Sequence, residues 1–110
     1  MLAAWKNQCG IIRQNNVCYI SNAKIHTAKA SGYLQQLCKH FSHKIDVEFT
    51  PEAGIITFDF GKADLIARPD MLQMTATAES AADLSRLEQV LGSHLERFAF
   101  REELKIKWDN

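Results

Sequence analysis

Residues 45–78 contain the pattern that most restricts the fold, because short apolar–polar alternations are separated there by turn residues. The alternation is strict over residues 45–49 and again over residues 56–60. Such alternation is typical of strands with one buried and one solvated face. The runs that separate the strands are too short for a crossover connection, so neighbouring strands must pair in an antiparallel manner. This part of the chain therefore predicts an antiparallel meander.

Two of its turns carry specific predictions. Glycine adopts the positive φ that the first central position of a type II′ turn requires, so we expect Gly61-Lys62 to form one hairpin loop. Proline fixes the φ angle of the first central position in a type I turn, so we expect Pro69-Asp70 to form the next one.

Two segments with helical periodicity flank the meander. In the first, the apolar stripe is Ala30, Leu34, Leu37 and Phe41. Thr27 is suited to be its N-cap. In the second, the stripe is Leu84, Leu87, Leu91, Leu95 and Phe98. Ser80 and Asp83 form a variant of the capping box at its start. Gly92 inside this helix costs about 1 kcal/mol relative to alanine, so it marks either close packing or a bend.

A strand is predicted at each end of this arrangement. Residues 17–25, "VCYISNAKI", are rich in β-branched and aromatic side chains. Residues 104–108, "LKIKW", alternate strictly, which predicts a half-buried strand with its lysines outward. The predicted order is β-α-β-β-β-β-α-β. We therefore expect an α+β, two-layer sandwich, in which an antiparallel sheet is covered on one face by two helices.

Length and composition narrow the function classes. The 110 residues suffice for a single domain, which we assign to residues 17–110, after a loosely ordered lead-in at residues 1–16. Thirteen basic residues balance 13 acidic ones, which argues against a general electrostatic footprint for nucleic acid or an anionic membrane. No segment resembles a signal peptide or a membrane span. The three cysteines form no C-x-x-C pair, which indicates reduced thiols and a cytoplasmic protein.

The octet "LCKHFSHK", residues 37–44, suggests a metal site at first sight. Residues two apart on a helix differ by about 200° in direction, so Cys38 and His40 point to opposite sides, with Cys38 toward the core. His40 and His43 are three apart and share a face, so they could supply part of a metal or haem site. The alternative is that they only complement the negative C-terminal end of the helix, together with the neighbouring lysines.

A second basic cluster lies on the second helix. His94, Arg97 and Arg101 recur along one flank of the apolar stripe. A histidine with two guanidinium groups could bind a carboxylate or a phosphate, because arginine offers a planar bidentate fork. The alternative is local pairing with the glutamates of the same segment.

We expect the two basic clusters to lie apart. If every connection reverses the chain, the two helices run antiparallel, and their basic C-termini lie at opposite ends of the helical layer. His40 and His43 would then lie near Glu79 and Asp83, at the start of the second helix.

No catalytic motif stands out. The sequence lacks a G-x-S-x-G elbow, a glycine-rich phosphate loop and an H-E-x-x-H pair. We therefore expect a binding domain rather than an enzyme, with a small enzyme of unknown reaction left open. The edge formed by "LKIKW" is either protected by its lysines or paired in a dimer.

Residues from about 17 to 108 resemble a family of small bacterial proteins, domain of unknown function 2218. The stretches that carry the resemblance are "YLQQLCKHFSHK", "ITFDFG" and "HLERFAFREELKIKW". Some relatives are joined to siderophore-interacting flavoproteins, so the resemblance implies a link to iron handling, with such a flavoprotein as a partner. It assigns no roles to its motif residues, which here are Cys38, His40, His43, Phe60, Gly61, His94, Arg97, Phe98 and Arg101.

These observations favour a non-enzymatic binding or accessory domain for an anionic ligand, contacted by His94, Arg97 and Arg101. The alternative is a metal- or haem-binding protein that uses His40 and His43. The sequence has no flavin-binding segment, and we expect no resident cofactor.

Overall fold

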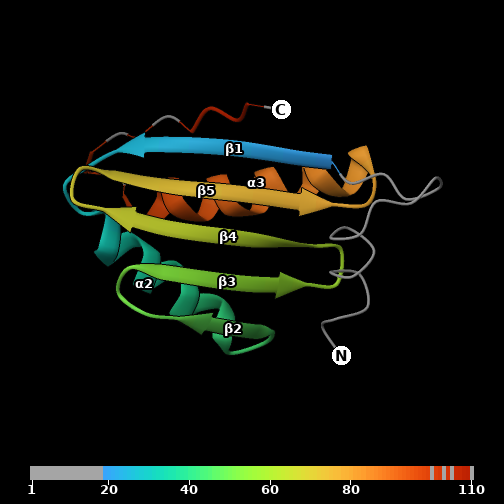
Figure 1. Cartoon of the computed structure of the whole chain (residues 1–110), viewed down its shortest axis with the longest axis horizontal. Coiled ribbons are helices and arrows are strands. Elements are labelled where there is room, and N and C mark those ends of the chain that lie inside the picture. Colours follow the sequence, from blue (N-terminus) through green and yellow to red (C-terminus); the bar gives the residue numbers. More distant parts are fainter. Residues whose placement is uncertain (1–18, 100, 103, 105, 110) are drawn as a thin grey trace.

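A computed structural model describes residues 19–99, 101–102, 104 and 106–109 of the chain (Figure 1). The predicted lead-in at residues 1–16 lies outside the described residues. The elements are β1 (Tyr19–His26), α2 (Ala30–Ser42), β2 (Asp46–Phe49), β3 (Ala53–Phe58), β4 (Gly61–Arg68), β5 (Met71–Ala78) and α3 (Ala81–Phe98). Their order, β-α-β-β-β-β-α, confirms the prediction up to the end of the second helix.

The five strands form one antiparallel sheet in the order β1-β5-β4-β3-β2. The meander is confirmed, since β2 to β5 pair consecutively. Strand β1 adds to the far edge by pairing with β5 along its whole length, from Tyr19↔Ala78 to His26↔Met71. The first two strands of the chain therefore lie at opposite edges of the sheet.

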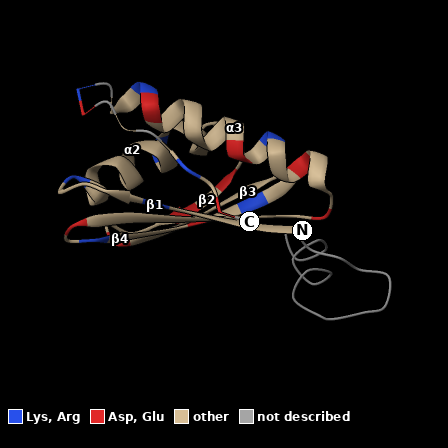
Figure 2. Ribbon diagram, turned by 90° about the horizontal axis from the view of Figure 1, so that it is seen from above, with Lys and Arg blue, Asp and Glu red and all other residues tan. Residues whose placement is uncertain are grey.

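Both helices cover the same face of the sheet, which confirms the two-layer α+β sandwich (Figure 2). Helix α2 packs against β2, β3, β4 and β5, and α3 packs against β5, β1 and β4. The core between the layers is apolar, and its fully buried large side chains include Leu34, Leu37, Ile56, Leu65, Leu72, Met74, Leu87, Leu91 and Leu95. No helix in the described part of the chain is long and apolar enough to cross a membrane.

The hairpin turns are confirmed in one case and shifted in the other. Arg68 pairs with Met71, so Pro69-Asp70 is the two-residue loop that its sequence predicts. The prediction for Gly61-Lys62 is wrong, because Phe58 pairs with Gly61 and the loop is Asp59-Phe60.

Gly61 is required for a different reason than the turn. A Cβ at Gly61 would lie 2.6 Å from the backbone oxygen of Thr77 and 3.0 Å from Leu87 Cδ2. The residue is glycine because β4, β5 and α3 approach each other closely at this point.

The predicted strand at residues 104–108 is wrong in its extent. Among its described residues none is in a strand, and the segment joins the sheet only beyond it, by one bridge between Asp109 and Asn22 of β1. The Asn22 N–H donates to the Asp109 carbonyl at 2.9 Å, and the Asp109 N–H donates to the Asn22 carbonyl at 2.8 Å. Leu104, Ile106 and Trp108 pack against the core as predicted. Ile106 and Trp108 lie beside Gly92 of α3, and this contact with the helical layer draws the segment away from the edge of β1.

The starts of both helices are capped differently from each other. Ser80 is the N-cap of α3 and accepts a hydrogen bond from the Asp83 N–H at 3.0 Å, as predicted. The prediction that Thr27 is the N-cap of α2 is wrong, since Lys29 occupies that position without a side-chain cap. The Thr27 hydroxyl instead accepts from the Lys29 N–H at 3.0 Å, in a turn that precedes the helix.

The same hydroxyl takes part in a polar cluster that joins the two helices. Thr27 Oγ1 lies 2.9 Å and 3.1 Å from the two carboxylate oxygens of Glu102, to which it donates. The Tyr33 hydroxyl donates to Glu102 Oε2. We call Thr27, Tyr33 and Glu102 the Glu102 clasp. It ties the start of α2 to the turn that follows α3.

The clasp shifts the pKa of both its ionisable members. Burial raises the pKa of Tyr33 to about 12, and the hydrogen bond and the charge of Glu102 add to the effect. The Tyr33 hydrogen bond lowers the pKa of Glu102, against an opposing effect of burial, while the Thr27 hydroxyl and the Lys29 charge lower it further. The tyrosine therefore keeps its proton and the glutamate is ionised at neutral pH.

Two glycine substitutions test the packing around α3. We expect Gly92→Ala to raise the free energy of unfolding by about 1 kcal/mol, because alanine favours the helix. Its Cβ would meet only ordinary contacts, 3.7 Å from Trp108 Nε1 and 3.8 Å from Ile106 Cβ. Gly61→Ala should instead lower that free energy by about 1–3 kcal/mol through overpacking. Urea unfolding of both variants measures the difference, and equal effects would contradict the assigned roles.

Removing the Tyr33 hydroxyl tests the clasp. We expect Tyr33→Phe to lower the free energy of unfolding by about 1 kcal/mol at pH 7, the usual contribution of such a hydrogen bond. Because the pKa of Glu102 is lowered from 4.5, the contribution of its charge is present above that value and is lost as the pH falls through the folded-state pKa. Thermal unfolding at pH values from 7 to 3 should show that the difference in Tm between the wild type and Tyr33→Phe becomes smaller. A difference that stays constant would exclude the ionised carboxylate as its source.

Candidate functional site

The basic ends of the two helices meet at a pair of histidines. The rings of His40 on α2 and His94 on α3 lie with their centroids 4.8 Å apart and their planes tilted by 48°. His40 is exposed and His94 is partly buried. The prediction that the two clusters lie apart is therefore wrong.

The physical reason lies in the path of α2. Figure 1 shows α2 lying obliquely behind β4, β3 and β2, whereas α3 runs nearly along β1 and β5. The 13 residues of α2 extend about 20 Å and the 18 residues of α3 about 27 Å. Because α2 is shorter and crosses the sheet, it ends beside the C-terminal half of α3 and does not reach the start of that helix.

A row of aromatic rings holds the histidine pair in place. The Phe41 ring lies 5.0 Å from His94 and 5.1 Å from Phe58, and Phe58 lies 5.2 Å from Phe60 in the β3–β4 turn. On the other side, Phe98 lies 5.7 Å from His40. Most of these contacts are edge-to-face or tilted, the arrangement that aromatic rings prefer. The positions of both imidazoles are therefore set by packing that continues into the core.

One hydrogen bond fixes the tautomer of His94. Its Nδ1 lies 2.7 Å from the carbonyl oxygen of Val90, one turn earlier in α3. A carbonyl only accepts, so Nδ1 carries the proton and Nε2 bears the lone pair when the ring is neutral. Among the described residues no hydrogen-bond partner contacts His94 Nε2 or either ring nitrogen of His40. Both rings thus have nitrogen atoms available to a ligand.

The charges around His40 are positive. Packing among its neighbours removes part of its hydration, and this lowers the pKa of His40 below 6.5. Nearby positive groups lower the pKa further, in the order His94, His43, Arg97 and Lys44. We call these five residues the basic surface. His40 is therefore neutral at pH 7, in a field that favours an anion.

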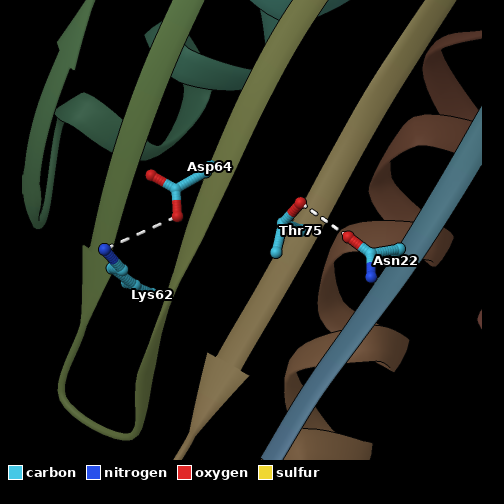
Figure 3. Close-up of polar contacts among 4 residues, drawn as sticks. All are labelled: Asn22, Lys62, Asp64 and Thr75. Carbon is cyan, nitrogen blue, oxygen red and sulfur yellow. Dashed lines mark hydrogen bonds and ion pairs between the residues drawn. The ribbon is translucent and has the colours of Figure 1, made fainter. Parts of the chain in front are cut away.

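Within the described part of the chain, the basic surface has no carboxylate partner. Arg97 and Lys44 form no ion pair with any residue that the structure describes. The ion pair of Lys62 with Asp64, at 3.5 Å, lies on the face of the sheet that points away from the helices, where Thr75 also donates to Asn22 at 2.8 Å (Figure 3). No carboxylate that the structure describes therefore compensates the charge of this surface.

The remaining candidates occupy different surroundings. Arg101 lies exposed in the turn after α3, and His43 is the exposed C-cap residue of α2. Cys38 is fully buried, and burial raises the pKa of its thiol to about 11. This confirms that Cys38 faces the core while His40 faces outward. No group of three or more metal-ligating side chains occurs among the described residues.

Two contributors to the site were missed by sequence reasoning. The sequence pattern places Phe41 only in the core stripe of its helix, and it does not predict that Phe60 lies in a turn. A usable signal existed for the histidines, since His40 and His94 each flank an apolar stripe and so lie at a helix boundary with the core. What no local pattern revealed is that these two boundaries face each other.

Comparison with known proteins identifies the family. Residues 22–109 match the family described as "Uncharacterized protein conserved in bacteria", domain of unknown function 2218. The chain belongs to this family. No curated protein matches it.

A solved structure of similar fold is the NMR structure of PA4090 from Pseudomonas aeruginosa. It is 36% identical, superposes with a TM-score of 0.72, and the match covers 83% of this chain and 95% of that one. The domain 2218 protein described here therefore shares its architecture with a bacterial relative of nearly the same extent.

The origin of the lowered pKa of His40 can be tested directly. Arg97→Gln removes one of the positive charges that disfavour protonation of His40, so we expect the pKa of His40 to rise. Arg68→Gln makes the same change at the exposed end of β4 and should leave that pKa where it is. NMR titration of the imidazole ring signals measures both. Equal pKa values in the two variants would show that Arg97 does not act on His40.

Proposed function

We propose that this domain 2218 protein is a binding domain for an anionic ligand, and that the basic surface is its contact. The observation that supports the proposal best is that Arg97 lies close enough to His40 to disfavour its protonation, while no described carboxylate pairs with Arg97. An anion seated there would relieve this repulsion and would meet a guanidinium suited to bidentate binding.

Ligand binding at this surface is coupled to protonation. His94 donates its Nδ1 proton to Val90, so its Nε2 can donate to an anion only after taking up a proton. His40 is neutral at pH 7 and also becomes a donor and a cation when protonated. A bound anion favours the charged form of His40, so affinity rises as the pH falls from 7 toward the pKa of His40.

Arg101 was expected to complete the contact. It lies beyond the end of α3, and we assign the primary contact to Arg97 and His94 with His40 added from α2. In this proposal the protein acts in the cytoplasm as an accessory domain. The relatives joined to siderophore-interacting flavoproteins support a role beside such enzymes, in which the anionic group belongs to an iron chelator.

Titration with small anions tests the proposal. We expect citrate and pyrophosphate to bind the wild-type protein, with affinity that increases between pH 7.5 and pH 6 and decreases with salt. Arg97→Gln should weaken binding by about ten-fold or more, since loss of a charged hydrogen-bonding group costs at least about 1.4 kcal/mol. Isothermal titration calorimetry measures these affinities.

The control is Arg68→Gln, which has the same net charge and should bind like the wild type. Circular dichroism should show the same cooperative unfolding for both variants. If both variants weaken binding equally, the effect is one of net charge and the basic surface is not a site. If neither anion binds the wild-type protein, the proposed function fails.

A further inference from the structure

We propose that the His40–His94 pair coordinates a divalent transition metal ion that arrives inside an anionic chelate, the two imidazoles filling coordination positions that the chelator leaves open. The inference rests on the proposed function and specifies the class of ligand: an unsaturated metal complex whose remaining donors are carboxylates or similar anionic groups.

The separation of the rings fits one shared metal ion. A metal–nitrogen bond of about 2.1 Å places the centroid of a ligating imidazole about 3.2 Å from the metal. Two such rings at adjacent positions, about 90° to 109° apart, then have centroids about 4.5–5.2 Å from each other. The observed separation of His40 and His94 is 4.8 Å, with the rings tilted by 48°. Rings on opposite sides of a metal would need about 6.4 Å, so the geometry favours adjacent positions.

The chemistry of the donor atoms also fits. The Val90 carbonyl accepts from His94 Nδ1, which orients the ring and leaves Nε2 as the donor toward a metal. A hydrogen bond of this kind on the second ring nitrogen is the usual partner of a ligating histidine. Neutral imidazole is a good ligand for zinc, nickel and copper.

The surroundings exclude a bare cation as the preferred ligand. A protein site for a free metal ion usually offers three or four ligands, and no group of three occurs among the described residues. The positive neighbours Arg97 and Lys44 repel a free cation and attract a complex of net negative charge. A chelator resolves both difficulties, because it brings the missing donors together with the negative charge.

The inference also predicts which complexes are rejected. A chelator that fills every coordination position leaves nothing for the imidazoles to bind. Such a saturated complex would be held only through its charge, like a metal-free anion. An unsaturated complex gains two metal–nitrogen bonds in addition. The site would therefore discriminate by open coordination positions and not by charge alone.

The experiment uses nickel nitrilotriacetate as the probe, since this anionic complex has two adjacent open positions. The full chain without a histidine tag is titrated by calorimetry with nickel nitrilotriacetate, with nitrilotriacetate alone and with nickel chloride. We expect the complex to bind at least about ten-fold more tightly than either component. His40→Phe and His94→Phe should each remove this advantage, because phenylalanine keeps the ring contacts and removes the nitrogen.

Two controls accompany these variants. His26→Phe alters an exposed histidine on β1 and should bind like the wild type. Since a variant could fold poorly, the copper complex of the same chelator is added to the wild-type protein, where we expect selective paramagnetic broadening of the His40 and His94 NMR signals. Broadening centred on another histidine would overturn the inference.

The outcomes separate this inference from the proposed function. If nitrilotriacetate binds equally well with and without nickel, the metal inference fails while anion binding stands. If free nickel binds as tightly as its complex, a bare-ion site replaces the chelate site. If neither the chelates nor citrate and pyrophosphate bind, the proposed function and the inference fail together.

Discussion

The placement of β1 and β2 at opposite edges of the sheet is the constraint on which the rest of the structure depends. Helix α2 connects these two strands, so it has to cross the sheet. The helix itself covers β5 to β2, and the residues on either side of it complete the connection between the two edges. Its oblique course leaves room for α3 over β5 and β1, and it brings His40 beside His94.

Local signals were sufficient for most of the elements up to the end of α3 and insufficient for their contacts. Alternation over residues 45–49 and 56–58, the Pro69-Asp70 turn and the Ser80–Asp83 cap predicted structure correctly, because each depends on interactions within a few residues. The turn predicted at Gly61-Lys62 was wrong because glycine is required at close backbone contacts as well as in turns. The close contact of Gly61 with Thr77 joins residues far apart in the sequence, so the local pattern does not show it. The same applies to the candidate site. His40, His94 and Arg97 could be picked out individually, but their convergence follows from β1 pairing with β5, which no local pattern specifies.

The arrangement of the basic surface suits ligand binding and does not stabilise the fold. The fold gains no stability from placing His94 and Arg97 against His40, since both oppose the protonation of His40. Ion pairing elsewhere, as between Lys62 and Asp64, shows the ordinary use of surface charge. Local arrangements that oppose stability are expected where a protein binds or reacts, because the ligand supplies the compensation. The contacts with the neighbouring aromatic rings hold the imidazoles in place by apolar packing, which offsets the repulsion.

The two helices are held together at two separate points, and this determines how a ligand would be received. The Glu102 clasp joins the start of α2 to the turn after α3, and the aromatic contacts join the end of α2 to His94. These two points, together with the packing of both helices on the sheet, fix the relative direction of the helices. The separation of the histidines is therefore a property of the scaffold and exists before any ligand arrives. A preformed pair requires little ordering on binding, so the affinity of the site should depend mainly on the charge and the donor atoms of the ligand.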